Sequence, residues 1–236
     1  MAESIYNRKK RANATVEVLD FKMTLDPADS MECQFLFRPQ LYDREEMGFL
    51  RRLLKPGHTF VDAGANVGFY SLIASSLVGN TGKVISIEAD PFNASRLEAN
   101  IRLSKVSNVR LANVGLSDQA ETLRLGLSMS GNRGGNSFLY DSPNTVSVEC
   151  RTLTDVLLAE GVQKVDGAKM DIEGFEFKVL QRFFADGNSK LWPGFLIIEV
   201  NPFFEKKTDG DILALLAQNG YGLTCISELN YLAVRK

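Results

Sequence analysis

The sequence is poor in the residue types that most often carry catalysis or bind metals, with one histidine and three cysteines among 236 residues. His58 directly precedes a predicted strand, at the end of the sheet opposite to where α/β proteins place their sites. Any base must therefore be a carboxylate or a lysine. The cysteines Cys33, Cys150 and Cys225 are odd in number and widely separated, which fits neither a disulfide framework nor a metal-binding spacing.

Two further absences narrow the class of protein. No apolar run approaches the ~20 residues of a membrane span, and the N-terminus lacks the apolar core of a signal peptide. The net charge of -2 and the pI of about 5.6 provide no broad positive field for a phosphate backbone. The basic cluster Arg8-Lys9-Lys10-Arg11 lies in a polar tail that is typical of a solvated terminus. We therefore expect a soluble, cytoplasmic protein without a membrane span or a nucleic-acid partner.

The length and the 44% hydrophobic content suit one α/β domain with a sizeable core, which we place at residues 56–236. Residues 1–55 are expected to form an N-terminal extension. It combines the basic tail, a short β element around residues 33–37 and a helix at residues 42–54. Lys55-Pro-Gly57 ends that helix.

The rest of the chain alternates between strand and helix patterns. Strands are predicted near Phe60, Val84, Val109, Ala168 and Phe195, and helices are predicted to begin near Val67, Pro91, Thr154, Phe175 and Asp209. This alternation predicts a doubly wound, Rossmann-like sheet that is mostly parallel. The runs 220–226 and 230–234 predict an antiparallel hairpin at its C-terminal edge.

The segment Thr59 to Ser71, followed by Val84 to Asp90, reads as strand, glycine turn, helix, strand and acid. Gly64 lets the backbone turn sharply and approach a ligand, and Gly68 lets the helix lie close to the sheet. Glu88 ends the second strand, where a carboxylate accepts hydrogen bonds from both hydroxyls of a ribose. The pattern predicts a nucleoside-type cofactor, and a tight strand-to-helix turn without a ligand is the alternative.

Asn66 separates two kinds of nucleoside cofactor. A dinucleotide site needs a second glycine at this position, so that a pyrophosphate can rest against the backbone. The asparagine side chain crowds a pyrophosphate but suits a smaller, less anionic and amino-acid-like ligand. S-Adenosylmethionine fits that description.

The fourth core strand places Lys169, Asp171 and Glu173 at alternate positions, so the three side chains point the same way. Charged groups on a central strand are tolerated where partners or function compensate for burial. The alternative is a structural Lys169–Asp171 ion pair with Glu173 capping the next helix. Glu199 ends the fifth strand, and such neighbouring acids leave a divalent metal open. We expect none, because no histidine or tight acid motif accompanies them.

Five segments together resemble the FkbM-type family of class I methyltransferases. They are Asp62-x-Gly-Ala-Asn-x-Gly-Phe-Tyr70, Ile87-Glu-Ala-Asp-Pro91 with Leu97-x-x-Asn100, Val114-Gly-Leu-Ser-Asp118, Arg151-Thr-Leu-Thr-Asp-Val-Leu157 and Lys169-Met-Asp-Ile-Glu-Gly-Phe-Glu176. The resemblance runs from about Tyr42 to the C-terminus. It implies a class I methyltransferase sheet, in which a closing antiparallel hairpin is usual, and S-adenosylmethionine-dependent O-methylation of a small-molecule hydroxyl, often on a sugar or polyketide.

The resemblance also implies roles for individual residues. Asp62, Gly64 and Asn66 would frame the methionine moiety, Glu88 the ribose and Ser117-Asp118 the adenine side, with Asp171 beside the sulfonium. The full cofactor-binding set is Asp62, Gly64, Ala65, Asn66, Gly68, Glu88, Ala89, Ser117, Asp118 and Asp171. If an acceptor hydroxyl must lose a proton, Asp171, Glu173 and Lys169 are the catalytic candidates. The acceptor, for which glycosides are one class, and the oligomeric state stay open.

Between the predicted strands 122–127 and 146–150 lies a glycine-rich loop at residues 130–137. Its length suggests a lid or an acceptor-binding element, and an ordinary hairpin tip is the alternative. Arg133, its only cation, would meet a carboxylate or a sugar hydroxyl.

Other functions remain to be weighed against the methyltransferase. A NAD-dependent oxidoreductase would share Glu88, but Asn66 and the closing hairpin oppose it. A catalytically silent module would bind S-adenosylmethionine and act by partner contact, which the acids of the fourth strand oppose. Asn201-Pro-Phe-Phe204 resembles the Asn-Pro-Pro-aromatic motif of methyltransferases that act on nucleobase amines, but a turn formed by Asn-Pro is the preferred interpretation.

Overall fold

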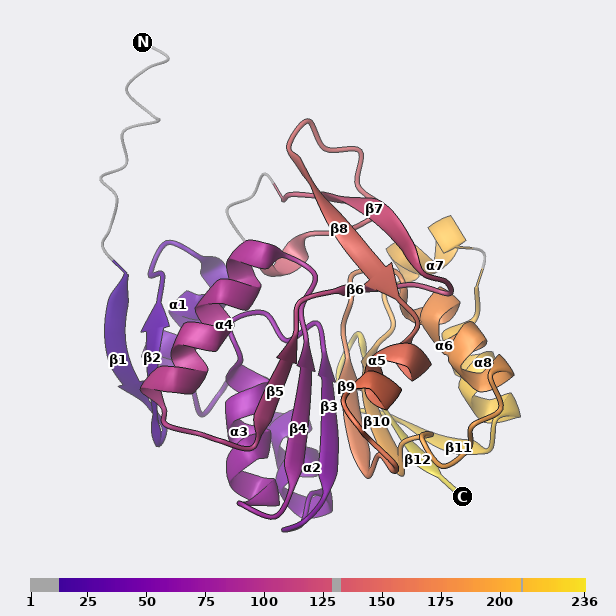
Figure 1. Cartoon of the computed structure of the whole chain (residues 1–236), viewed down its shortest axis with the longest axis horizontal. Helices are drawn as coiled ribbons and strands as arrows, with labels where there is room; N and C mark the ends of the chain where they lie inside the picture. Colours follow the sequence, from indigo (N-terminus) through magenta and orange to yellow (C-terminus); the bar gives the residue numbers. More distant parts are fainter. Residues whose placement is uncertain (1–12, 129–132, 209) are drawn as a thin grey trace.

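A computed structural model describes residues 13–128, 133–208 and 210–236 (Figure 1). The basic cluster at residues 8–11 and the helix start predicted near Asp209 lie outside these ranges, as does part of the glycine-rich loop. None of the helices in the described part of the chain has the length and apolar character that crossing a membrane requires.

A seven-stranded sheet forms the centre of the molecule, with the strand order β11-β12-β10-β9-β3-β4-β5. The strands are β3 (Thr59–Ala63), β4 (Lys83–Ile87), β5 (Val109–Ala112), β9 (Gly167–Met170), β10 (Phe195–Glu199), β11 (Tyr221–Cys225) and β12 (Asn230–Arg235). β12 is antiparallel to both of its neighbours, and the pairings among β10, β9, β3, β4 and β5 are parallel. The predicted doubly wound sheet and its closing hairpin are confirmed. The chain winds outward in both directions from β3, which creates the switch point where α/β sheets bind ligands.

Helices cover both faces of this sheet (Figure 1). They are α2 (Arg44–Leu53), α3 (Phe69–Val78), α4 (Pro91–Leu103), α5 (Leu153–Ala159), α6 (Glu176–Ala185) and α8 (Ile212–Gln218). Phe60 and Val61 are successive residues of β3 but join different hydrophobic clusters, because successive side chains of a strand point to opposite faces. A parallel sheet buried on both faces reads as continuous apolar runs, as this sequence does.

The N-terminal segment differs from its prediction. The short β element expected at residues 33–37 is wrong, since this stretch belongs to helix α1 (Ser30–Phe37). Asp29 caps the helix by accepting hydrogen bonds from the backbone N of Met31 and of Glu32, at 2.9 and 3.1 Å. A hairpin of β1 (Ala14–Val18) and β2 (Phe21–Leu25) precedes it.

The boundary placed after residue 55 remains a proposal. Residues on both of its sides share one hydrophobic cluster, with Leu25 and Leu50 on the N-terminal side and Leu72 of α3 on the other.

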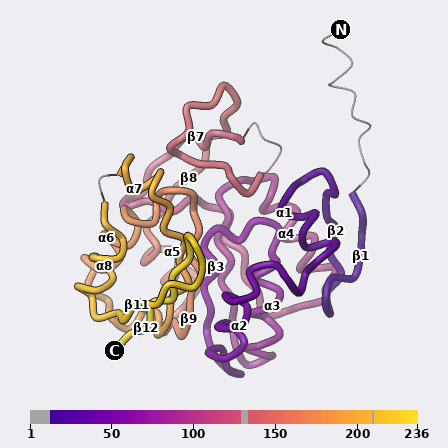
Figure 2. Tube along the Cα trace, turned by 180° about the vertical axis from the view of Figure 1, so that it is seen from behind, coloured from indigo at the N-terminus to yellow at the C-terminus, as the bar shows by residue number. Residues whose placement is uncertain are grey.

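A smaller sheet lies beyond the carboxyl ends of the central strands (Figures 1 and 2). It contains β6 (Gly115–Leu116), β7 (Glu121–Gly126) and β8 (Thr145–Arg151), in the order β6-β8-β7. The strands predicted on either side of the glycine-rich loop are therefore confirmed. A short 3-10 turn, η1 (Arg133–Gly135), brings part of that loop back toward α4.

The turn predicted at residues 201–204 is present, with 2.9 Å between Phe204 N and the carbonyl oxygen of Asn201, and it continues as helix α7 (Pro202–Thr208). Asn201 Oδ1 accepts a hydrogen bond from the backbone N of Phe203 at 3.1 Å. Pro202 occupies the first helical position, where a missing N–H is harmless.

Candidate active site

A pocket opens at the carboxyl ends of β3, β4 and β9 and encloses about 860 Å³ of empty space, part of it open to solvent. Nine of the sequence-predicted site residues line it: Asp62, Gly64, Ala65, Asn66, Glu88, Ala89, Lys169, Asp171 and Glu173. Gly68, Ser117 and Asp118 are not among the lining residues.

Glu88 stands at the end of β4 and is 7% exposed. Its Oε2 accepts a hydrogen bond from Asn66 N and its Oε1 accepts one from Asp90 N, both at 2.8 Å. Burial raises the pKa of Glu88 to about 7, against the lowering effect of these two N–H groups. Each oxygen keeps a lone pair for a further donor, so the carboxylate can accept one hydrogen bond from each of two hydroxyls.

Gly64 and Gly68 serve close packing. Gly64 has φ +83°, and a Cβ there would lie 1.8 Å from the carbonyl oxygen of Asp171. The cofactor turn thus lies directly against the chain that leaves β9. Gly68 has φ +98°, and a Cβ would lie 2.2 Å from Leu97 Cδ1, so this glycine allows contact with α4.

Asp62 is fully buried below the turn. Ser71 Oγ donates to its Oδ2 at 2.5 Å, whereas Oδ1 has no hydrogen-bond partner among the described residues. Burial raises the pKa of Asp62, opposed by the nearby Lys169 ammonium. A pocket-lining carboxylate oxygen without a partner fits a ligand that brings an N–H donor, and the amino group of a methionine moiety is such a donor.

Ser117 and Asp118 are held by other partners. Ser117 Oγ donates to Glu121 Oε1 at 2.6 Å, and Lys178 Nζ lies 3.0 Å from Asp118 Oδ1. The apolar residues Val114 and Leu116 line the pocket on this side instead.

Lys169 and Asp171 form an ion pair on β9 and just after it, with 2.9 Å between Nζ and Oδ2. Burial alone would lower the pKa of Lys169, but the carboxylates of Asp171 and Asp62 raise it above its usual range. Burial would likewise raise the pKa of Asp171, and the Lys169 ammonium holds it below its usual range. Lys169 Nζ also lies 4.8 Å from the ring centroid of Tyr70, which encloses the charge.

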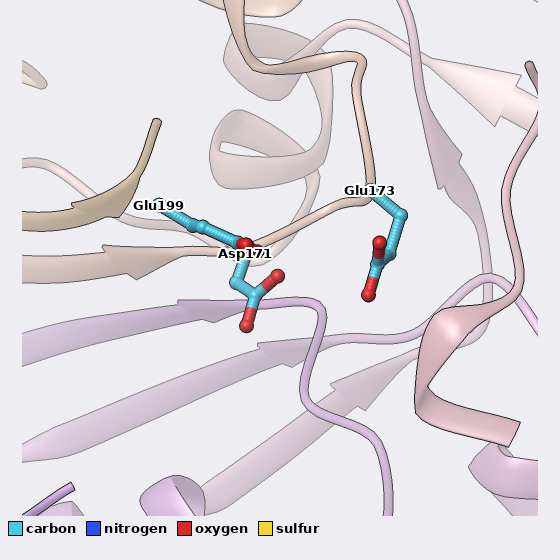
Figure 3. Close-up of side chains that lie close together, drawn as sticks. All are labelled: Asp171, Glu173 and Glu199. Atoms are coloured by element: carbon cyan, nitrogen blue, oxygen red, sulfur yellow. The ribbon is translucent and has the colours of Figure 1, made fainter. Parts of the chain in front are cut away.

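Three carboxyl groups meet at the ends of β9 and β10 (Figure 3). Glu199 points toward Asp171 and Glu173 approaches from the following turn, and one oxygen of each lies within 4.8 Å of the others. Burial and the charge of Asp171 raise the pKa of Glu173 to about 8 and that of Glu199 to about 9. A divalent cation is the kind of ligand such a set can hold, although Lys169 already neutralises Asp171.

The turn that carries Glu173 is constrained. Glu173 has φ +54°, and Ser137 Oγ donates to its backbone carbonyl at 2.6 Å. Glu176, rather than Glu173, accepts hydrogen bonds from the backbone N of Ile172 and of Gly174, at 2.7 and 2.9 Å. The Glu173 carboxyl therefore remains available to the pocket, and the Lys169–Asp171 ion pair coexists with it.

Sequence reasoning missed the wall that the N-terminal segment contributes. Phe35 and Tyr42 line the pocket together with Phe69, and the Phe35 and Phe69 rings stack with centroids 4.2 Å apart. Phe35 was not expected in the pocket, because residues 33–37 were predicted as a short β element. The guanidinium of Arg133, the cation of the glycine-rich loop, lies 2.9 Å from Asp90 Oδ2, and a role of Arg133 in binding an acceptor stays a prediction.

The switch-point pocket, the ribose-type acid and the closing hairpin together define a class I methyltransferase that uses S-adenosylmethionine. A family model described as "Methyltransferase FkbM domain" matches residues 62–223, so the chain belongs to the FkbM methyltransferase family.

Comparisons with individual proteins agree with this assignment. Methyltransferase sdnD from Sordaria araneosa is 27% identical over 203 residues, which cover 72% of this chain and 76% of the relative. A precorrin-6Y C5,15-methyltransferase from Geobacter metallireducens superposes with a TM-score of 0.50 at 14% identity, over 82% of this chain and 87% of that one. A putative rRNA methylase from Clostridium thermocellum gives 0.51 at 12% identity, over 80% and 92%. The two solved structures support the fold.

Proposed function

We propose that this methyltransferase methylates a hydroxyl oxygen of a small molecule, with a sugar, a glycolipid or a polyketide-like compound as the acceptor. The observation that carries the proposal is the Glu173 carboxyl, which lines the pocket beside the Lys169–Asp171 pair. With a pKa of about 8, its protonation changes near neutral pH, where a general base is most effective.

The cofactor-binding residues act by position and charge. The Asp62 carboxylate receives the amino group of the methionine moiety at its unpaired Oδ1, and Gly64, Ala65 and Asn66 form the turn around that moiety. Glu88, which lines the pocket next to Ala89, accepts hydrogen bonds from the ribose hydroxyls. The cofactor supplies its methyl group on a sulfonium, which is already an activated donor. The protein then mainly aligns the acceptor and excludes water.

The acid residues have separate tasks. Lys169 keeps Asp171 ionised. The negative charge of the Asp171 carboxylate then favours a positively charged sulfonium beside it. Glu173 accepts the proton that an acceptor hydroxyl loses as its oxygen is methylated. Glu199 shares a hydrogen bond with Asp171, and burial together with the charge of Asp171 raises the pKa of Glu199 to about 9, so this carboxyl serves as a proton store.

The test combines binding and product analysis. Titration calorimetry with S-adenosylhomocysteine and with NAD should show binding of the former alone. A screen with isotopically labelled methyl donor, beginning with glycosides, should yield a product whose label resides on oxygen by NMR. A labelled nitrogen or carbon would overturn O-methylation.

Asp171→Asn should lower turnover while retaining binding, and undiminished turnover would remove Asp171 from the site. A wild-type chain that binds cofactor but methylates nothing in the screen would favour the silent module. The cytoplasmic location and a small-molecule acceptor remain part of this proposal.

A further inference from the structure

A buried amide on α4 lines the cofactor pocket and has an oxygen without a partner. Asn93 is 2% exposed and belongs to the pocket lining. Its Nδ2 donates to the backbone carbonyl of Arg133 at 3.3 Å, whereas its Oδ1 has no hydrogen-bond partner among the described residues. A buried acceptor left unpaired is unfavourable, so a donor that arrives with a ligand would stabilise it.

The orientation of this amide follows from its surroundings. A backbone carbonyl only accepts, so the nitrogen of Asn93 must face Arg133 and the oxygen must face elsewhere. Arg133 is held at two points, because its backbone N donates to Asp29 Oδ2 at 3.1 Å and its guanidinium lies 2.9 Å from Asp90 Oδ2. Asn136 Nδ2 donates to the same Asp90 oxygen at 2.9 Å. These contacts fix the carbonyl and leave Oδ1 as the atom that a ligand can use.

The position of Asn93 identifies the part of the cofactor that lies beside it. Asn93 stands in the first turn of α4, directly after the cap residue Asp90. Asp90 joins Glu88 and Arg133, so Asn93 lies on the Glu88 side of the pocket, where the ribose is expected. Ala89 and Phe138 pack against the small hydrophobic cluster around Leu125, and all three line the pocket. Such an apolar wall suits the flat adenine ring. Asn93 therefore borders the adenosyl end of the pocket, away from Asp171.

We propose that Asn93 is a cofactor-binding residue whose Oδ1 accepts a hydrogen bond from the adenosyl group. That group has two kinds of donor, the ribose hydroxyls and the exocyclic amine, and a neutral amide oxygen accepts from either. The inference rests on the cofactor site of the proposed function and is independent of which acceptor is methylated.

The experiment is a calorimetric titration of the wild type and of Asn93→Leu with S-adenosylhomocysteine and three analogues. The analogues lack the exocyclic amine, the 2′-hydroxyl or the 3′-hydroxyl. Loss of a neutral hydrogen bond should weaken binding of S-adenosylhomocysteine roughly 5- to 10-fold in the variant. The penalty should disappear for the one analogue that lacks the donor, which identifies it. An equal penalty with every analogue, or no penalty with S-adenosylhomocysteine, would overturn the proposal.

A matched control separates this effect from general destabilisation. Asn108 is a partly buried amide whose Nδ2 donates to the carbonyls of Ser75 and Gly79, and it lies outside the pocket lining. Asn108→Leu should lower the unfolding temperature and leave the affinity unchanged. If Asn93→Leu does not fold, Asn93→Ser tests the same atom. Failure of the wild type itself to bind S-adenosylhomocysteine would refute the cofactor site, whereas wild-type binding with an unaffected variant refutes only the role of Asn93.

Discussion

The two halves of the pocket orient their carboxylates in different ways. On the cofactor side, both oxygens of Glu88 are held by backbone N–H groups of the same strand-turn-helix-strand unit. On the acid side, Glu173 and Glu199 follow different strands, and burial and the charge of Asp171 raise the pKa values of both. The first arrangement produces a rigid ligand contact, and the second produces groups whose protonation can change during a reaction. Binding and proton transfer should therefore respond separately to substitution.

The largest effect is expected for Glu173→Gln. The amide keeps the shape of the side chain but cannot take a proton, so turnover should fall about 100-fold or more, while affinity for S-adenosylhomocysteine changes less than about twofold. Steady-state kinetics with calorimetry measure both quantities. Glu98→Gln, on the exposed face of α4, is the matched control and should leave both unchanged. Equal turnover in Glu173→Gln and the parent would remove Glu173 from the catalytic residues. The acid side of the pocket would then have no role in proton transfer that distinguishes it from the cofactor side.

A smaller effect, on binding, is expected for Glu88→Ala. The substitution removes charge-assisted hydrogen bonds to both ribose hydroxyls, so affinity for S-adenosylhomocysteine should fall by on the order of 2 kcal/mol, about 30-fold. Asp118→Asn serves as the comparison, because Asp118 is paired with Lys178 outside the pocket lining. We expect it to change the affinity less than about twofold. If Asp118→Asn loses more affinity than Glu88→Ala, the adenine would lie beside Asp118, as the sequence suggested. That result would contradict the placement of Asp118 outside the cofactor pocket.

The smallest effect is a pH dependence of cofactor affinity. Burial raises the pKa of Glu88 to about 7 in the free protein, and ribose hydroxyls favour its charged form. Because protonation below that pKa removes the acceptor, affinity for S-adenosylhomocysteine should increase about tenfold between pH 6 and pH 8. Calorimetry at several pH values measures this change. Glu88→Gln should lack this part of the dependence, and an identical profile in that variant would assign the titration to another group.

Several elements of this protein were predictable from local patterns. The apolar runs near Phe60, Val84 and Phe195 form core strands, since a parallel sheet covered on both faces requires such runs. The element at residues 33–37 was predicted wrongly because its apolar residues suit either structure, and the cap at Asp29 decides for a helix. Asn201 and Pro202 signal a chain break equally well as a turn or as a helix start.

The individual site residues show the same limit. Glu88 and Asn66 belong to one local unit and could be paired from their spacing, and the structure joins them by a hydrogen bond. Asn93 lies only five residues after Glu88, yet nothing in its spacing shows that its oxygen lacks a partner. That property depends on Arg133, which reaches α4 from a distant loop.

The sequence by itself determined the alternation of strands and helices, the nucleoside-binding turn and the candidate acids, because these follow from the periodicity and side-chain chemistry of neighbouring residues. Only the tertiary structure decided which groups face one another. It placed Glu199 beside Asp171, held the Gly64 turn against the chain leaving β9, and left oxygens of Asp62 and Asn93 unpaired in the pocket. Burial and electrostatic coupling depend on contacts between segments far apart in the chain, and local sequence does not specify them.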